Sequence, residues 1–307
     1  MTTAPEPVPI TPNPMAIFLS VSRFHIVAIA ALGTFTFHWL FTGEYSWSLP
    51  VICAVDWFVV NLLNRVVDLD EDRINRVVGV TFVQRHHRAL TWLGFSVLGT
   101  SLVATHALYP EITWLRLAYH ALGLTYNWRL LPGGRRIKEL YFFKNTASAL
   151  GFMLTVFCYP LATVGWGVDA SQLAPGITMA TILVSAAFFT LFELSYEVIY
   201  DLRDAPGDAV AGVKTYPVVH GLDGAMKITD ALIAVSSLTL LIGYASGVVP
   251  WRIFVMILAP ALNYFVYKRA MARGITSADC VNLTWLGAGL LTAYHFWVFV
   301  GLPGVGI

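Results

Sequence analysis

The hydropathy pattern constrains this chain more than any other feature. Runs of about 20 mainly apolar residues recur along the sequence, and a run of that length crosses a bilayer when it forms a helix. We count about nine: roughly 16–41, 47–66, 89–108, 112–131, 140–164, 176–200, 227–246, 250–268 and 281–302. Of the 307 residues, 57% are hydrophobic and only 12% are charged, unlike a soluble domain. The sequence therefore predicts an all-α, polytopic membrane bundle of about nine transmembrane helices.

The opening segment and the basic residues predict the organisation and the orientation of the chain. Residues 1–14 are rich in Pro and Thr and lack the regions of a signal peptide, so we expect a disordered tail there. No linker divides the remainder, which predicts a single transmembrane domain over 15–307. Lys and Arg collect after the second, fourth, sixth and eighth spans, and such an excess marks cytoplasmic loops. The N-terminus is thus expected in the cytoplasm, and the chain in the inner membrane if it is bacterial.

Net charge and cysteine usage exclude several function classes. The net charge is +1 and the basic residues form no continuous run, which argues against nucleic acid as a partner. The three cysteines fall in or beside predicted spans and lack the spacing of a metal site or a disulfide framework. We expect buried thiols in a protein surrounded by membrane lipids.

Two acid-rich segments lie where long apolar runs end, on the side expected to face the cytoplasm. Residues 64–72 read NRVVDLDED, and residues 197–208 read EVIYDLRDAPGD. Together they hold eight of the 18 acidic residues, although more than a hundred residues separate them. Carboxylates four apart on a helix repel each other, so these clusters call for bridging cations. Each segment is expected to open a polar loop of about 25 residues, which predicts two similar halves that face one central cavity.

The spacing within each segment would place oxygen ligands on one helix face. Asn64, Asp68 and Asp72 are four residues apart, which predicts one stripe, two turns long, at the end of the second span. The second segment repeats the spacing on the sixth span and then runs on into the expected loop: Glu193, Glu197 and Asp201, then Asp204 and Asp208.

Carboxylate and amide oxygens at these positions suit a hard cation. Mg²⁺ usually binds proteins through one or two carboxylates together with substrate phosphates, so the segments predict Mg²⁺ and a diphosphate substrate. Basic residues expected on the same side of the membrane would support the diphosphate: Arg73, Arg135, Arg136, Lys138 and Lys214. A hydrocarbon tail would then lie between the helices.

Asp56 lies within the second span, about two turns before Asn64. An intramembrane acid is a functional hypothesis by default, but a hydrogen-bonded structural acid fits this position almost as well. Both interpretations stay open on the sequence.

The acidic segments resemble the motifs of the UbiA-type intramembrane prenyltransferase family. The family's first motif, Asn-Asp-x-x-Asp-x-x-x-Asp, is matched by Asn64, Asp68 and Asp72. Its second, Asp-x-x-Asp-x-x-x-Asp leading to Gly-x-Lys-Thr-x-Pro, is matched by Asp201, Asp204, Asp208, Gly212, Lys214, Thr215 and Pro217. Weaker matches to the family are Arg23, which resembles an arginine early in the family's first helix, and three residues around the start of the fifth helix: Tyr126, Lys138 and Asn145. The resemblance covers nearly the whole chain.

The resemblance implies an enzyme that moves a prenyl group from a prenyl diphosphate to an aromatic or lipid-like acceptor. It implies two Mg²⁺ ions in a cavity open to the membrane, with these ligands: Asn64, Asp68, Asp72, Asp201, Asp204 and Asp208. The implied catalytic residues are Asp68, Asp72, Asp204, Asp208, Lys138 and Tyr126. The expected substrate-binding residues are Arg23, Arg73, Arg135, Arg136, Lys138, Asn145, Glu197 and Lys214. Ring faces of Tyr126, Tyr196 and Tyr200 would stabilise a cation-like allylic carbon.

Two departures from the family pattern leave the acceptor open. Arg65 stands where the family often has Asp, and residues 81–88 replace the Arg-Pro-Leu-Pro-Ser-Gly-like segment that often follows the first motif. A terpene cyclase on the same scaffold, which uses no acceptor, is therefore an alternative. A cation-coupled transporter and a non-catalytic isoprenoid-binding membrane protein are alternatives of other classes. Transport sites usually lie near the bilayer midplane, whereas these acids lie mainly at one face.

Overall fold

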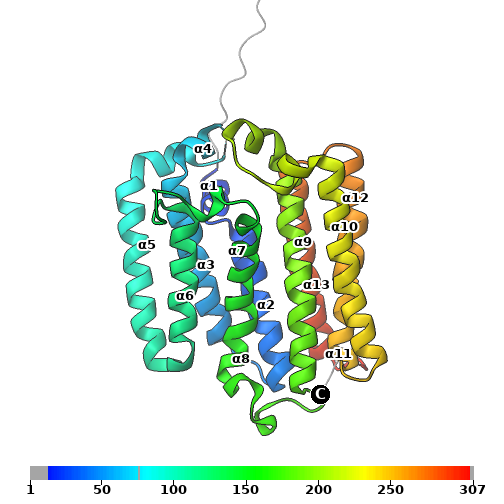
Figure 1. Ribbon diagram of the computed structural model, residues 1–307. Coiled ribbons are helices and arrows are strands. Elements are labelled where there is room, and N and C mark those ends of the chain that lie inside the picture. Colours follow the sequence, from blue (N-terminus) through cyan, green and yellow to red (C-terminus); the bar gives the residue numbers. More distant parts are fainter. Residues whose placement is uncertain (1–12, 75–76, 305–307) are drawn as a thin grey trace, which may run out of the picture.

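The computed structural model describes residues 13–74 and 77–304, and within them the chain is a bundle of helices with no strand (Figure 1). The α-helices are α1 (Pro14–Val21), α2 (Phe24–Thr42), α3 (Ser48–Val67), α4 (Leu69–Ile74), α5 (Val80–Leu108), α6 (Thr113–Asn127), α7 (Phe143–Phe152), α8 (Tyr159–Thr163), α9 (Met179–Ala211), α10 (Tyr216–Ala245), α11 (Trp251–Phe254), α12 (Leu258–Ala272) and α13 (Ser277–Val300). A π-helical segment, η3 (Met153–Cys158), joins α7 to α8, and a 3₁₀ turn, η6 (Val255–Ile257), joins α11 to α12. The predicted all-α membrane bundle is confirmed, and the tail expected over 1–14 falls mainly on residues outside the described part.

Each predicted span corresponds to a helix or to a pair of joined helices. Seven of these are long and apolar enough to cross a membrane, judged by length and composition. The other two predicted spans fall on α5, whose first turns carry the basic residues 85–88, and on α6, which has 15 residues. The count of nine is therefore approximate, and the chain is an integral membrane protein.

Three predicted boundaries and both long polar loops were wrong. Helix α9 continues to Ala211, past the expected end near residue 200, and α10 begins at Tyr216. Helix α5 begins at Val80, nine residues before the expected start of its span. Hydropathy marks the part of a helix that crosses the membrane, whereas charged residues extend a helix beyond the bilayer without breaking its hydrogen bonds. Residues 212–215 therefore join α9 to α10 where a loop of about 25 residues was expected, and the first expected loop is shortened by α4 and by the early start of α5.

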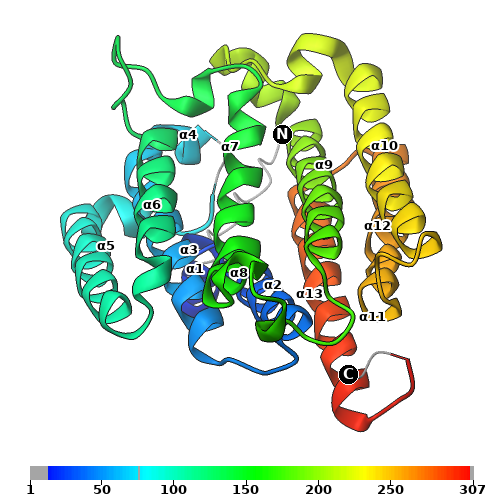
Figure 2. The same ribbon diagram turned by 60° about the horizontal axis from the view of Figure 1, so that its bottom comes forward.

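The acidic segments lie at one end of the bundle, which we call the acidic end. Figure 1 shows α4 and the junction between α9 and α10 together at the top, whereas α8 and α11 lie at the opposite end. Helix α2 packs against α3 and α13, and α9 packs against α10 and α7. The tilted view in Figure 2 separates α9, α10, α12 and α13 from α3, α5 and α6, with α2 and α7 between the two groups.

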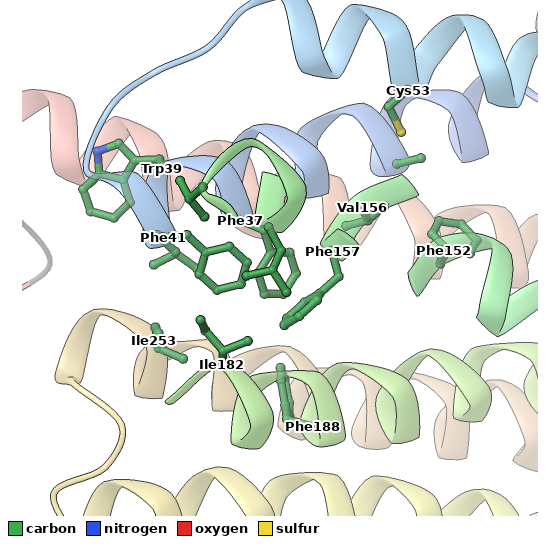
Figure 3. Packing of buried hydrophobic residues seen from close by; sticks show 14 of the residues in the cluster. Phe37, Trp39, Phe41, Cys53, Phe152, Val156, Phe157, Ile182, Phe188 and Ile253 are labelled. Atoms are coloured by element: carbon green, nitrogen blue, oxygen red, sulfur yellow. The ribbon is translucent and has the colours of Figure 1, made fainter. Parts of the chain in front are cut away.

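Aromatic side chains fill the half of the bundle away from the acidic end. The rings of Phe37 and Phe157 lie 5.0 Å apart in an edge arrangement, and Phe41 packs 5.1 Å from Phe157. Figure 3 shows these rings facing Phe188 and Ile182 of α9. Edge-to-face pairs at this separation are the favoured geometry of aromatic rings.

Asp56 is the centre of a buried polar network that joins α3 to α6 and α8. Its carboxylate accepts hydrogen bonds from Arg116 Nε at 3.0 and 3.1 Å and from Tyr159 Oη at 2.8 Å, and His120 Nε2 lies 2.8 Å away. Arg116 also donates to Thr105 Oγ1 at 2.6 Å, and the side chains of Asp56 and Arg116 are both 0% exposed. This saturated network supports the structural interpretation of Asp56.

Candidate functional site

A cavity of about 1530 Å³ opens between the helices and extends from the acidic end into the membrane-level part of the bundle. Both acidic segments contribute to its wall, although they come from opposite halves of the sequence. All six residues expected to bind metal line it: Asn64, Asp68, Asp72, Asp201, Asp204 and Asp208. The expected meeting of the two segments at one cavity is thus seen in the structure.

The first segment spans a helix break. Helix α3 ends at Val67, and Asp68 caps it with φ −90° and ψ 23°, outside the helical range. Asp72 then lies on the short helix α4, and its backbone N–H donates to Asp68 O at 2.8 Å. The single continuous stripe expected over Asn64, Asp68 and Asp72 was therefore wrong, yet the break still leaves the three side chains on the cavity wall.

Two basic residues from the turn before α7 bind the first segment. Lys138 Nζ donates to Asp68 Oδ1 at 2.7 Å and to Glu71 Oε2 at 2.6 Å. Arg136 Nη1 lies 3.5 Å from Asp68 Oδ1 and 3.1 Å from Glu71 Oε1. Burial raises the pKa of Asp68 against the opposing charge of Lys138. Burial is the largest single influence on Glu71 and acts to raise its pKa, but the charges and hydrogen bonds of Lys138 and Arg136 together outweigh it, so the pKa of Glu71 is lowered.

Arg65, the departure from the family pattern, contacts the acids directly. Its Nη1 donates to Asp72 Oδ1 at 2.6 Å, and both side chains are about nine-tenths buried. Arg65 also lines the cavity. A cation thus occupies the position where the family often has a further carboxylate, and it neutralises an acid of the same motif.

The second segment lies on one continuous helix. Asp201, Asp204 and Asp208 are three and four residues apart on α9, the spacing that brings side chains to one helix face. Lys144 Nζ donates to Asp201 Oδ1 at 2.7 Å and to Asp208 Oδ2 at 3.2 Å. Asn145 lies behind the wall and donates from Nδ2 to Asp201 Oδ2 at 2.9 Å. The loop expected around Asp204 and Asp208 was wrong, because α9 continues through both.

Sequence reasoning missed Lys144, which lines the cavity and joins two acids of the second segment. The signal was present, because Lys144 is the only lysine or arginine within the apolar run 140–164, and ionisable residues within membrane spans are rarely without a partner. Glu71, Arg65 and Arg203 are further cavity residues outside the expected set, and Arg203 forms an ion pair with Asp204.

The expected substrate-binding cations divide into three groups. Arg23 and Lys138 line the cavity. Arg136 lines a smaller pocket on the other side of Asp68 and Glu71. Three further residues are exposed and do not line the main cavity: Arg73, Arg135 and Lys214. The sequence predicted that five of these residues, all but Arg23, lie on the same side of the membrane as the acids, but it did not predict which ones line the cavity.

Below the acids, the cavity wall is apolar and aromatic with a few polar groups. Tyr126 and Glu197 line it as expected, and Glu197 Oε1 accepts a hydrogen bond from Ser148 Oγ at 2.6 Å. Tyr196 and Tyr200 also line it, but their hydroxyl groups donate to backbone carbonyls of α13 at 3.3 and 3.1 Å. The guanidinium of Arg203 lies over the ring of Tyr200, 5.0 Å from its centroid.

Among the described residues, no three His, Cys, Asp or Glu side chains lie close enough to one another to hold a metal by themselves. The acids are instead spaced along helix turns and form ion pairs with nearby Lys and Arg side chains. Such an arrangement suits an ion that takes one or two carboxylates and completes its shell with water and phosphate oxygens.

The family model described as the UbiA prenyltransferase family matches residues 20–287. This chain belongs to that family. The structure is similar to that of a UbiA homolog from Archaeoglobus fulgidus bound to DMAPP and Mg²⁺, with a TM-score of 0.69, 18% identity, and coverage of 93% of this chain and 99% of that one. The same homolog bound to GPP and Mg²⁺ gives a TM-score of 0.67 at 18% identity, over 91% and 98% of the two chains.

The apo structure of a UbiA homolog from Aeropyrum pernix K1 is also similar, with a TM-score of 0.61, 18% identity, and coverage of 90% of this chain and 98% of that one. At these identities the likeness shows a shared fold. No curated protein matches the sequence.

Proposed function

We propose that this UbiA-family protein transfers a prenyl group from a prenyl diphosphate to an aromatic or lipid-like acceptor within the membrane. One observation carries the proposal: two acid-rich segments from opposite halves of the chain line one end of a cavity whose other end is apolar and aromatic. A prenyl diphosphate has the same division, with a highly charged head and a hydrocarbon tail. Basic residues gather at the acidic end, which by the positive-inside tendency supports a cytoplasmic opening.

The acids fit a magnesium-bound diphosphate. The Archaeoglobus homolog was solved once with DMAPP and Mg²⁺ and once with GPP and Mg²⁺. The oxygen donors of this chain are of the type that Mg²⁺ prefers. Asn64, Asp68 and Asp72 would supply one or two ligands to one ion, and Asp201, Asp204 and Asp208 would supply one or two to the other. Bound Mg²⁺ supplies a Lewis acid that stabilises negative charge on the departing diphosphate.

The chain's own residues support the charge and shield the tail. Lys138, Lys144 and Arg23 line the acidic end and would bind diphosphate oxygens that the metal leaves free. Phe152 and Phe188, which Figure 3 shows on facing elements, line the apolar part and would exclude water from the allylic carbon. Tyr126 lies on the same wall and would offer a ring face to developing positive charge.

The size of the cavity favours transfer over cyclisation. Pockets for one small molecule usually measure about 300–1,000 Å³, whereas this cavity measures about 1530 Å³. The additional volume supports a second substrate beside the donor. A transporter is less well supported, because all six carboxylate and amide groups of the motifs lie at the acidic end and not at a midplane helix break.

The proposal is tested by measuring Mg²⁺-dependent diphosphate release from geranyl, farnesyl and geranylgeranyl diphosphates by the purified protein. Each reaction is run with and without a membrane-lipid extract of the source cells, and the products are identified by mass spectrometry. Release that requires the extract and gives a prenylated lipid or aromatic compound supports a transferase. Release without the extract, giving a terpene hydrocarbon or alcohol, contradicts it in favour of a cyclase.

A further inference from the structure

Glu193 is a membrane-level acid that belongs to neither motif. It lies on α9, eight residues before Asp201, which places it about 12 Å from that residue along the helix axis. Its side chain lines the cavity, as do the neighbouring rings of Phe189 and Phe192. The carboxyl group of Glu193 is therefore beside the space that the hydrocarbon part of a donor, and any second substrate, would occupy.

Within residues 13–74 and 77–304, Glu193 has no hydrogen-bond or ion-pair partner. The polar groups nearest along the wall are engaged elsewhere. Ser148 donates to Glu197, one turn nearer the motif, and the hydroxyl groups of Tyr196 and Tyr200 donate to the backbone of α13. Glu193 thus keeps its full capacity to accept hydrogen bonds from a molecule in the cavity.

The contrast with Asp56 shows what a structural acid looks like in this bundle. Asp56 is fully buried and its carboxylate is saturated by Arg116, His120 and Tyr159. An acid at membrane depth costs several kcal/mol unless it meets such partners or a polar cavity. Glu193 has no such protein partners but faces a cavity, which is the arrangement of a ligand-binding group.

The chemistry of the two substrates identifies the ligand. A prenyl diphosphate carries its polar atoms at the head, which the two motifs would hold, and its tail has no hydrogen-bond donor. A charged amine at this depth would be costly, whereas a hydroxyl group can donate to a carboxylate. We propose that Glu193 binds a hydroxyl group of the prenyl acceptor, so that the acceptor is a phenol or an alcohol. This inference rests on the proposed function.

The test compares the wild type with Glu193→Met, which keeps the length and apolar bulk of the side chain but accepts no strong hydrogen bond. Glu111→Met, a change at an exposed acid of the turn Pro110–Ile112, is the matched control. Each protein receives the prenyl diphosphates, Mg²⁺ and the membrane-lipid extract, either untreated or with its hydroxyl groups methylated. Prenylated product, diphosphate release and the midpoint of thermal unfolding are measured.

The wild type and Glu111→Met are expected to give product only with the untreated extract. Glu193→Met should give at least tenfold less product at an unchanged or higher unfolding midpoint, and Glu193→Gln should recover part of the loss because its amide oxygen still accepts. Equal product from the methylated extract, full activity of Glu193→Met, or a lower midpoint for that variant would overturn the inference. If no protein releases diphosphate in any mixture, the proposed function itself fails.

Discussion

Asp56 and the acids of the cavity are chemically alike but lie in opposite environments. Asp56 is fully buried, and its carboxylate is enclosed by Arg116 and His120 of α6 and by Tyr159 of α8. The motif acids each meet one or two cations on one side and the cavity on the other. The comparison indicates that depth in the membrane does not by itself show the role of an acid. An acid that lines a cavity can bind a metal or a substrate, whereas an acid enclosed by protein donors is structural.

Breaking the Asp56 network should have the largest effect of any change described here. Asp56→Ala would leave the Arg116 guanidinium buried and unpaired, and removing one partner of a buried pair costs about 3–5 kcal/mol. We expect loss of folded protein, measured by monodisperse yield in detergent and by the thermal midpoint. The double variant Asp56→Leu with Arg116→Leu should recover much of the stability. A stable, active Asp56→Ala would contradict the structural assignment.

Removing a motif carboxylate should lower activity without lowering stability. Asp68→Asn and Asp204→Asn keep the shape of the side chain but remove a charged ligand, and we expect diphosphate release to fall about 10²–10³-fold, the size of a lost electrostatic contact in a transition state. The thermal midpoint should be unchanged or higher. Near-normal turnover in both variants would rule out metal binding at the motifs.

Lys144 combines features of both regions: it is a largely buried cation, and it contacts two motif acids, Asp201 and Asp208. Lys144→Met would leave Asp201 and Asp208 without their shared ammonium group, and a charged hydrogen bond is worth about 1.5–3 kcal/mol. We expect half-saturating Mg²⁺ to fall roughly tenfold, because the acids then repel each other and favour a divalent ion, while the KM for the donor rises. An unchanged Mg²⁺ titration would show that Lys144 does not compete for these acids.

The smallest effect is expected at the exposed basic residues that the sequence placed near the site. Lys214 belongs to the family's second motif but is exposed and does not line the cavity. Arg73 is also exposed, and its guanidinium lies 3.6 Å from Asp70 Oδ1 and donates to Gln84 Oε1 at 2.9 Å. Exposed ion pairs contribute about 0–1 kcal/mol. Lys214→Ala and Arg73→Ala should each change turnover less than about threefold. A loss comparable to that of Asp204→Asn would require these side chains to enter the cavity.

Hydropathy predicted the helical bundle well, because apolar length is what a bilayer requires of a spanning helix. It failed at the ends of α9 and α10, where charged residues continue the helix into water. Motif spacing correctly predicted that Asp68 and Asp204 share a cavity, but it did not predict the break at Asp68. Lys144 was not predicted as a partner of Asp201, because that contact depends on how α7 packs against α9. Arg65 was not predicted as a partner of Asp72, because the two residues meet across the unpredicted break at Asp68.

The central claim is that the two motifs form one site in one cavity. It is tested most directly by measuring Mg²⁺-dependent diphosphate release by Asp68→Asn, Asp204→Asn and the double variant under the conditions that give wild-type turnover. Groups that act as a unit are non-additive, so the double variant should lose little more than either single variant. Losses that multiply in the double variant, or a single variant that keeps near-normal turnover, would contradict a shared site.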